Sequence, residues 1–190
     1  MKKNENKIYK GDYGYIKEQR RLEIIKAVIM VILPIAIFLV GYFSTGSNQN
    51  ILTFVAVLGC LPMASNAIHA ILFIKAKGCS EELYKKLVGA GVVSTYYDLY
   101  FTAYKKNYQV SALIIKKGCL IAITEDETMV LSEGEDHLKD ILSKCGGEGI
   151  TVKFFNDADK YIERARELSN LSDDNKDYSF IYENIMSVSI

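Results

Sequence analysis

Asn66 and His69 are the side chains of this sequence with the clearest potential for chemistry. They lie three residues apart, on one face of a predicted helix, inside an uncharged apolar stretch. Polar groups at membrane depth often mark an ion or substrate path, but they also hydrogen-bond between helices and hold them together. We predict that Asn66 and His69 form a packing pair, because no Asp, Glu, Lys or Arg accompanies them in the stretch.

The remaining reactive side chains are dispersed. His137 follows Asp136 at a predicted helix start, and we expect it to be exposed. The acidic run Glu125–Glu127 has oxygen ligands for a hard cation such as Ca²⁺, but the EF-hand spacing is absent and a solvated loop is favoured. The four cysteines lack the CxxC spacing of a zinc or redox site, so reduced and buried thiols are expected: Cys60, Cys79, Cys119 and Cys145.

Motifs of common enzymes are absent from the sequence. It contains no GxxxxGK[ST], GxGxxG, GxSxG or HExxH pattern. Gly89 and Gly91 lie between a predicted helix and a predicted strand, the reverse of the order that a phosphate-binding loop needs. We therefore predict no catalytic residue, no metal site and no cofactor.

Tyrosines mark a candidate interaction face. Residues 92–104 are rich in Val, Thr, Tyr and Phe, which predicts a strand. Tyrosine is enriched at protein interfaces, so Tyr96, Tyr100 and Tyr104, with Tyr108 as a further member, are candidate contacts. The alternative is that tyrosine merely suits an edge strand. Strict alternation would bury Tyr97, Leu99, Phe101 and Ala103 on one face and leave Asp98, Tyr100, Thr102 and Tyr104 half-exposed on the other.

Two apolar stretches, Ala27–Phe43 and Ile51–Ile74, must position Asn66 and His69. With Leu22–Lys26 added to the first, each is long enough for a helix to cross a hydrocarbon core of ~30 Å. The sequence therefore predicts a transmembrane hairpin over residues 22–77, with spans at about 22–43 and 51–74. A signal peptide fits less well, because no small-x-small cleavage site follows Phe43 and a second apolar stretch begins at once.

Charge orients this hairpin. Residues 1–26 contain eight Lys and Arg, whereas Ser44–Asn50 contains no charge. The positive-inside rule then places both termini in the cytosol, in a multi-pass protein of the cell membrane. The basic N-terminal segment 1–21 would attract anionic lipids of the inner leaflet, and small residues in the second span would let it pack against another copy as a homo-oligomer. Residues 80–190 hold 13 Lys and Arg against 19 Asp and Glu, which argues against nucleic-acid binding.

The pattern of apolar residues in 79–190 predicts a cytosolic α+β domain. Its expected order is helix, three-stranded antiparallel meander, helix, strand, helix. The expected elements are a helix capped by Ser80, strands at 92–104, Val110–Ile115 and Cys119–Thr124, a helix with a capping box at Ser132–Glu135, a strand at Ile150–Phe155 and a helix opened by Asn156 and Asp157. Residues 178–190 are apolar enough to dock on the domain, as a strand or as a helix.

The order helix, three strands, helix, strand over residues 80–155 resembles the core of the restriction-endonuclease-like PD-(D/E)xK superfamily. In sequence the resemblance rests on Ser111–Ala122, where the turn glycine Gly118 matches a nuclease-related domain found on membrane-anchored proteins. Ser111 stands where the metal-binding Asp of that family would be, and no Glu-x-Lys follows Ile121. The resemblance therefore implies a catalytically inert relative, and no site residue is carried over from it.

These expectations combine into one main hypothesis. A membrane α-helical hairpin carries a cytosolic α+β domain that acts as a non-enzymatic interaction or regulatory module at the inner leaflet, with an unknown protein partner. A membrane-anchored hydrolase or degenerate nuclease is the first alternative. A small oligomeric channel or transporter component, with His69 in its path, is the second.

Overall fold

The computed structural model describes residues 8–92, 95–104, 106–170 and 176–190. It divides into two compact units, Lys17–Ala76 and a second unit that joins Met1–Ile16 to Lys77–Ile190. Of the N-terminal segment 1–21, residues 8–16 belong to the unit that contains the C-terminal domain, and residues 17–21 belong to the unit of the two long helices.

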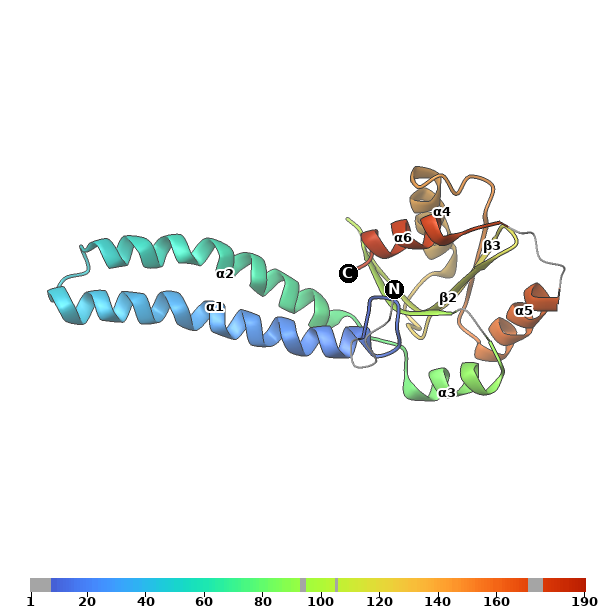
Figure 1. Ribbon diagram of the computed structural model, residues 1–190, viewed down its shortest axis with the longest axis horizontal. Coiled ribbons are helices and arrows are strands. Elements are labelled where there is room, and N and C mark those ends of the chain that lie inside the picture. The colour runs from blue at the N-terminus through green and yellow to red at the C-terminus, as the bar shows by residue number, and fades with distance from the viewer. Residues whose placement is uncertain (1–7, 93–94, 105, 171–175) are drawn as a thin grey trace. The chain divides into compact units, whose positions relative to one another are not determined.

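The first unit is a pair of helices, α1 (Tyr15–Thr45) and α2 (Ile51–Lys75), which run side by side (Figure 1). Both are long and apolar enough to cross a membrane. Asn50 caps α2, because its side chain accepts a hydrogen bond from the Thr53 N–H at 2.9 Å. At the other end, the Arg20 guanidinium donates to the Phe73 carbonyl at 2.8 Å, so the end of α2 is tied to α1. Asn50 Nδ2 also donates to the Thr45 hydroxyl of α1 at 3.1 Å, so hydrogen bonds join the two helices at both ends of the hairpin.

The second unit is built on a four-stranded mixed sheet in the order β1-β2-β3-β4. Its strands are β1 (Tyr96–Thr102), β2 (Asn107–Lys116), β3 (Cys119–Ile123) and β4 (Thr151–Phe155). The first three strands are antiparallel, which confirms the predicted meander. β4 pairs with β3 in parallel, because a helix intervenes and carries the chain back across the sheet.

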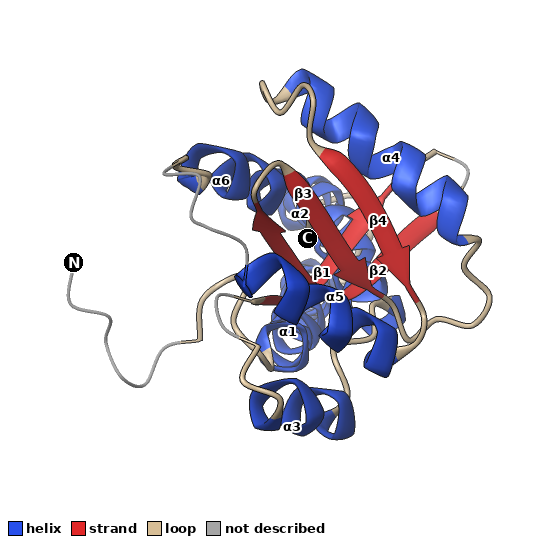
Figure 2. Cartoon of the chain, turned by 90° about the vertical axis from the view of Figure 1, so that its right-hand side faces the viewer, coloured by secondary structure: helices blue, strands red, loops and turns tan. Residues whose placement is uncertain are grey.

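Helices cover both faces of the sheet (Figure 2). On one face, α3 (Glu81–Gly89) and α5 (Ala158–Asn170) bury Leu83, Leu87, Tyr161 and Leu168 against Ile114 and Ile121. On the other, α4 (Leu131–Lys144) and α6 (Ser179–Val188) bury Leu138, Leu142 and Ile185 against Phe101, Ile115 and Phe154. The C-terminal segment, which the sequence left open between strand and helix, is therefore a helix.

Two local predictions are wrong. Helix α4 begins at Leu131 with Val130 at the N-cap and no capping side chain, so Ser132 does not form the expected capping box. In β1, Tyr97 packs with α3 and α5, whereas Leu99 packs on the opposite face with α4 and α6. The cause is Asp98, whose φ of 57° leaves the extended conformation and breaks the two-residue alternation of the strand.

Candidate functional site

Asp98 is a buried carboxylate of β1 that binds the two chain segments of its own unit that flank residues 17–76 in the sequence. Its side chain accepts a hydrogen bond from the Cys79 N–H at 2.6 Å and another from the Ile16 N–H at 3.3 Å. Ile16 lies in the first turn of α1, and Cys79 follows the end of α2. One residue of the sheet therefore holds both chain segments that connect the hairpin to the domain.

Neighbouring residues give the Asp98 side chain both space and hydrogen-bond donors. A Cβ atom on Gly78 would lie 2.9 Å from Asp98 Oδ1, so a larger residue at this position would have to displace the carboxylate. Burial raises the pKa of Asp98, while the N–H groups of Cys79 and Ile16 oppose that rise by bonding to the charged form. A left-handed conformation costs a residue with a Cβ about 1–2 kcal/mol. This cost, at a buried charge, indicates a position that the surrounding structure strongly determines.

The N-terminal segment 8–16 is fastened to the domain by aromatic and backbone contacts. Tyr13 stacks on Tyr84 of α3 with ring centres 3.9 Å apart, and Tyr84 meets Tyr97 edge to face at 5.3 Å. The Tyr97 N–H donates to the Gly11 carbonyl at 2.8 Å. Gly11 has a φ of +90°, and a Cβ there would lie 2.7 Å from the Tyr96 ring, so this position requires glycine. The segment is thereby held from Gly11 to Ile16.

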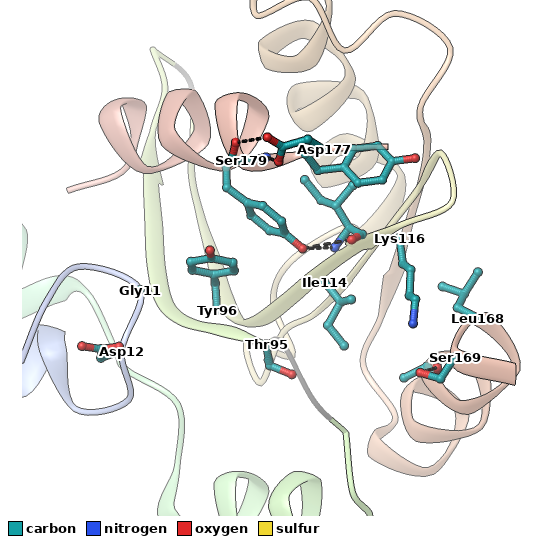
Figure 3. Close-up of a pocket in the computed structure, with 14 residues that line it drawn as sticks. Gly11, Asp12, Thr95, Tyr96, Ile114, Lys116, Leu168, Ser169, Asp177 and Ser179 are labelled. Carbon is teal, nitrogen blue, oxygen red and sulfur yellow. Dashed lines mark hydrogen bonds between the residues drawn. The ribbon is translucent and has the colours of Figure 1, made fainter. Parts of the chain in front are cut away.

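A cleft of about 730 Å³ opens beside the same segment, at the edge of β2 (Figure 3). β1 begins at Tyr96, opposite Leu113, while β2 continues to Lys116, so the last residues of β2 extend beyond their pairing with β1. The cleft is bounded by parts of the N-terminal segment, β1, β2, α5 and α6. Its lining residues are Gly11, Asp12, Thr95, Tyr96, Ile114, Ile115, Lys116, Ala165, Leu168, Ser169, Asp177, Tyr178, Ser179 and Tyr182.

Most polar atoms of the cleft already have structural partners. The Tyr182 hydroxyl accepts from the Ile115 N–H at 2.6 Å and donates to the Ile115 carbonyl at 3.0 Å, as a neighbouring strand would. Asp177 accepts from both the N–H and the hydroxyl of Ser179 at the start of α6. Two polar groups of the cleft differ. The Lys116 ammonium group has no hydrogen bond or ion pair among the described residues, and the buried Thr95 Oγ1 has no hydrogen-bond partner among them.

The predicted tyrosine residues do not share one exposed surface. Tyr96 lies in the cleft, with its ring centre 4.2 Å from that of Tyr182. Tyr100 is buried, and its hydroxyl accepts from Asn107 Nδ2 at 3.1 Å. Tyr104 is fully exposed after the end of β1. Tyr108 lies in a different, shallower cavity beside His137, so Tyr96 and Tyr108 do not share a site.

Asn66 and His69 differ in their hydrogen bonding. Asn66 Nδ2 donates to the Pro62 carbonyl of its own helix at 2.8 Å. The His69 side chain is exposed on α2, and no hydrogen bond reaches it from the described residues. The structure of this unit therefore gives Asn66 a partner within α2 and leaves His69 on the outer surface of the hairpin.

His137, expected to be exposed, is half-buried instead. Its ring stacks on Tyr108 at 4.7 Å and meets Phe101 edge to face at 6.2 Å. Its Nε2 atom is buried without a hydrogen-bond partner. Burial lowers the pKa of His137, although Asp140 acts in the opposite direction. The position at the start of a helix gave no sign of this, because Tyr108 comes from a different element.

In the described part of the chain, no group of three His, Cys, Asp or Glu side chains could hold a metal ion. Of the acidic run, Glu125 accepts from the Ser80 N–H at 2.9 Å, and Asp126 accepts from the Thr128 hydroxyl at 2.7 Å. Both carboxylates thus have structural partners: Glu125 binds the N-cap residue of α3, and Asp126 binds within its own turn. Comparison with protein families, curated proteins and solved structures finds no match to this chain.

Sequence reasoning missed Asp98 as a site residue. The signal was present, because a carboxylate lies among the large apolar side chains of Tyr96–Phe101. Such a residue needs hydrogen-bond donors if it is buried. Its donors are backbone N–H groups far away in the chain, and no sequence pattern identifies those.

Proposed function

We propose that this protein is held in the cell membrane by the hairpin α1–α2, with both termini in the cytosol. The proposal is supported by the two apolar helices and by the distribution of charge, eight Lys and Arg in residues 1–26 against none in Ser44–Asn50. The basic residues at the start of α1 would then lie close to the anionic lipids of the inner leaflet.

The α+β domain acts in this proposal as a non-enzymatic regulatory module coupled to the hairpin. The observation that carries it is the bonding of Asp98 to Ile16 and Cys79, at the beginning of α1 and after the end of α2. A change in the domain that moves β1 would act on both segments at once, because one carboxylate holds them. A coupling of this kind needs a discrete element whose state both regions influence.

The bonding within the cleft favours a role for the domain in binding a partner or ligand. The Tyr178 and Tyr182 hydroxyls and the Asp177 carboxylate are engaged in bonds that hold β2 and α6 in place. Catalytic acids, bases and nucleophiles must instead have groups that are free to exchange protons or attack a substrate. A partner or ligand that occupies the cleft would meet Tyr96, which contacts the N-terminal segment at Gly11.

The coupling is tested by hydrogen exchange on the full chain in phospholipid nanodiscs, comparing the native protein with Asp98→Asn. The variant keeps the shape of the side chain but removes its charge and one acceptor oxygen. We expect the amides of Ile16 and Cys79 to exchange at least about tenfold faster, since a hydrogen bond to a buried charge contributes roughly 1.5–3 kcal/mol. The first turns of α1 should also exchange faster.

Asp136→Asn is the matched control, because Asp136 is an exposed carboxylate on α4 that pairs with Lys139. It should leave the exchange of α1 unchanged. If Asp98→Asn accelerates exchange only within the sheet, or nowhere, then the domain is not coupled to the hairpin through this carboxylate and the proposed regulatory role fails.

A further inference from the structure

We propose that the cleft beside Tyr96 binds a small organic anion that carries a flat ring, with its anionic group paired to Lys116. This inference deepens the proposed function, because it names the class of ligand that the domain would sense.

Lys116 is the anchor for the anionic group. The lining carboxylates already accept hydrogen bonds, Asp177 from Ser179 and Asp12 from the Tyr9 N–H at 2.9 Å. The Lys116 ammonium has no acceptor among the described residues. Figure 3 shows its side chain reaching across the cleft toward Ser169 and Leu168 at the end of α5. An ammonium group bonds carboxylate and phosphate oxygens strongly when the site is partly shielded from water.

The walls of the cleft fit the ring of such a ligand. Ile114, Ala165 and Leu168 provide apolar lining, and the rings of Tyr96 and Tyr182, whose centres are 4.2 Å apart, add aromatic lining. Aromatic faces of this kind pack well against a flat ring. The volume of about 730 Å³ lies within the range of small-molecule sites.

A ligand in the cleft would contact the N-terminal segment 8–16, which leads into α1. The Tyr96 ring lies against Gly11, at a position with no space for a Cβ atom. From Gly11 the chain continues to Ile16, whose N–H is held by Asp98. A ligand stacked on Tyr96 therefore restrains the segment that leads into α1. Slower amide exchange between Gly11 and Ile16 is the expected sign of binding.

The test uses three probes with the same ring and different charge: phenyl phosphate, benzyl alcohol and benzylamine. Each is titrated against the full chain in phosphatidylcholine nanodiscs, and binding is followed by saturation-transfer NMR of the probe. We expect phenyl phosphate to bind at least about tenfold more tightly than the other two, because they lack the charge that pairs with Lys116. Lys116→Met should weaken phenyl phosphate binding at least about tenfold, and Lys116→Arg should restore it to within about threefold.

Lys139→Met is the matched control, since Lys139 is an exposed lysine of α4 that pairs with Asp136 and lies outside the cleft. It should not change binding. The proposal is overturned if benzylamine binds most tightly, if Lys116→Met binds phenyl phosphate as the native chain does, or if no probe binds at about 10 mM, which corresponds to roughly 3 kcal/mol. Binding without slower exchange at Gly11–Ile16 would support the site and contradict only its coupling to the hairpin.

Discussion

Single residues set the unusual features of this domain. Asp98 combines a left-handed backbone with a buried carboxylate, and it interrupts the strand that carries it. Gly78 and Gly11 give the space in which Asp98 and Tyr96 approach neighbouring backbone. His137 is a further case, because a titratable ring is packed between two aromatic side chains with one nitrogen unpartnered. Each of these residues links segments far apart in the sequence.

His137 should make the stability of the domain depend on pH. Burial lowers its pKa from the ordinary value of 6.5, so the unfolded chain binds a proton more readily than the folded chain does. The stability that neutral His137 contributes is therefore complete above about pH 6.5 and decreases as the pH falls toward the lowered pKa of the folded state. Urea unfolding of the full chain in neutral detergent, at about pH 7.5 and about pH 5.5, measures the decrease.

The variant His137→Phe isolates this effect. Phenylalanine keeps a ring that stacks on Tyr108 and cannot bind a proton. The free energy of unfolding should therefore fall less on acidification in the variant than in the native chain, and all other titrating groups are the same in both. An identical fall in the two proteins would show that His137 does not lose a proton on folding.

Sequence patterns predict some of the helices and strands correctly and fail for others. The amphipathic stripes of α3 and α5 and the apolar runs of β2, β3 and β4 indicated these elements correctly, because local periodicity determines which face is buried. α6 was ambiguous, since a short apolar segment suits either a helix or a strand. The alternation of β1 failed at Asp98, where contacts to Cys79 and Ile16 outweigh the extended preference of the strand. The cleft was not predictable, because five separate segments form it.

His69 of helix α2 is exposed, and no hydrogen bond from the described residues satisfies its ring. The sequence predicted that Asn66 and His69 act together in packing, and that role stays a prediction. The bonding of Asn66 to the Pro62 carbonyl now separates the two residues. In a membrane, His69 would be the group that gains from a second copy of α2, because a polar side chain facing lipid is costly.

We therefore expect His69→Leu to weaken self-association of the chain in liposomes about 3- to 30-fold, the effect of a polar interhelical contact of roughly 0.6–2 kcal/mol. Asn66→Ala should change it much less and serves as the control. Energy transfer between singly labelled copies, measured over a range of protein-to-lipid ratios, reports the association. Equal effects of the two substitutions would contradict this assignment. A pH-dependent ion flux that disappears in His69→Leu, with self-association unchanged, would indicate a path instead.

At the scale of the whole molecule, the chain is organised so that one domain receives both ends of one hairpin. Residues 8–16 and 77–190 form a single unit, with Lys17–Ala76 between them. This arrangement requires the beginning and the end of the hairpin to be on the same side of any membrane that it crosses. An even number of spans satisfies that requirement, and two candidate spans are present among the described residues.

The topology can be measured directly with an impermeant thiol reagent on intact cells. Cys60, Cys79, Cys119 and Cys145 are first replaced by alanine, and single cysteines are then introduced as Ser47→Cys, in the turn between α1 and α2, or Ser143→Cys, at the exposed end of α4. We expect Ser47→Cys to react and Ser143→Cys to be protected, because the basic residues before α1 favour the cytosolic side. After the cells are permeabilised, both positions should react equally, which shows that protection comes from the membrane and not from burial. Reaction of Ser143→Cys alone in intact cells would reverse the orientation. Reaction of both would mean that the chain does not cross the membrane as a hairpin, and the inner-leaflet role of the domain would then fail with it.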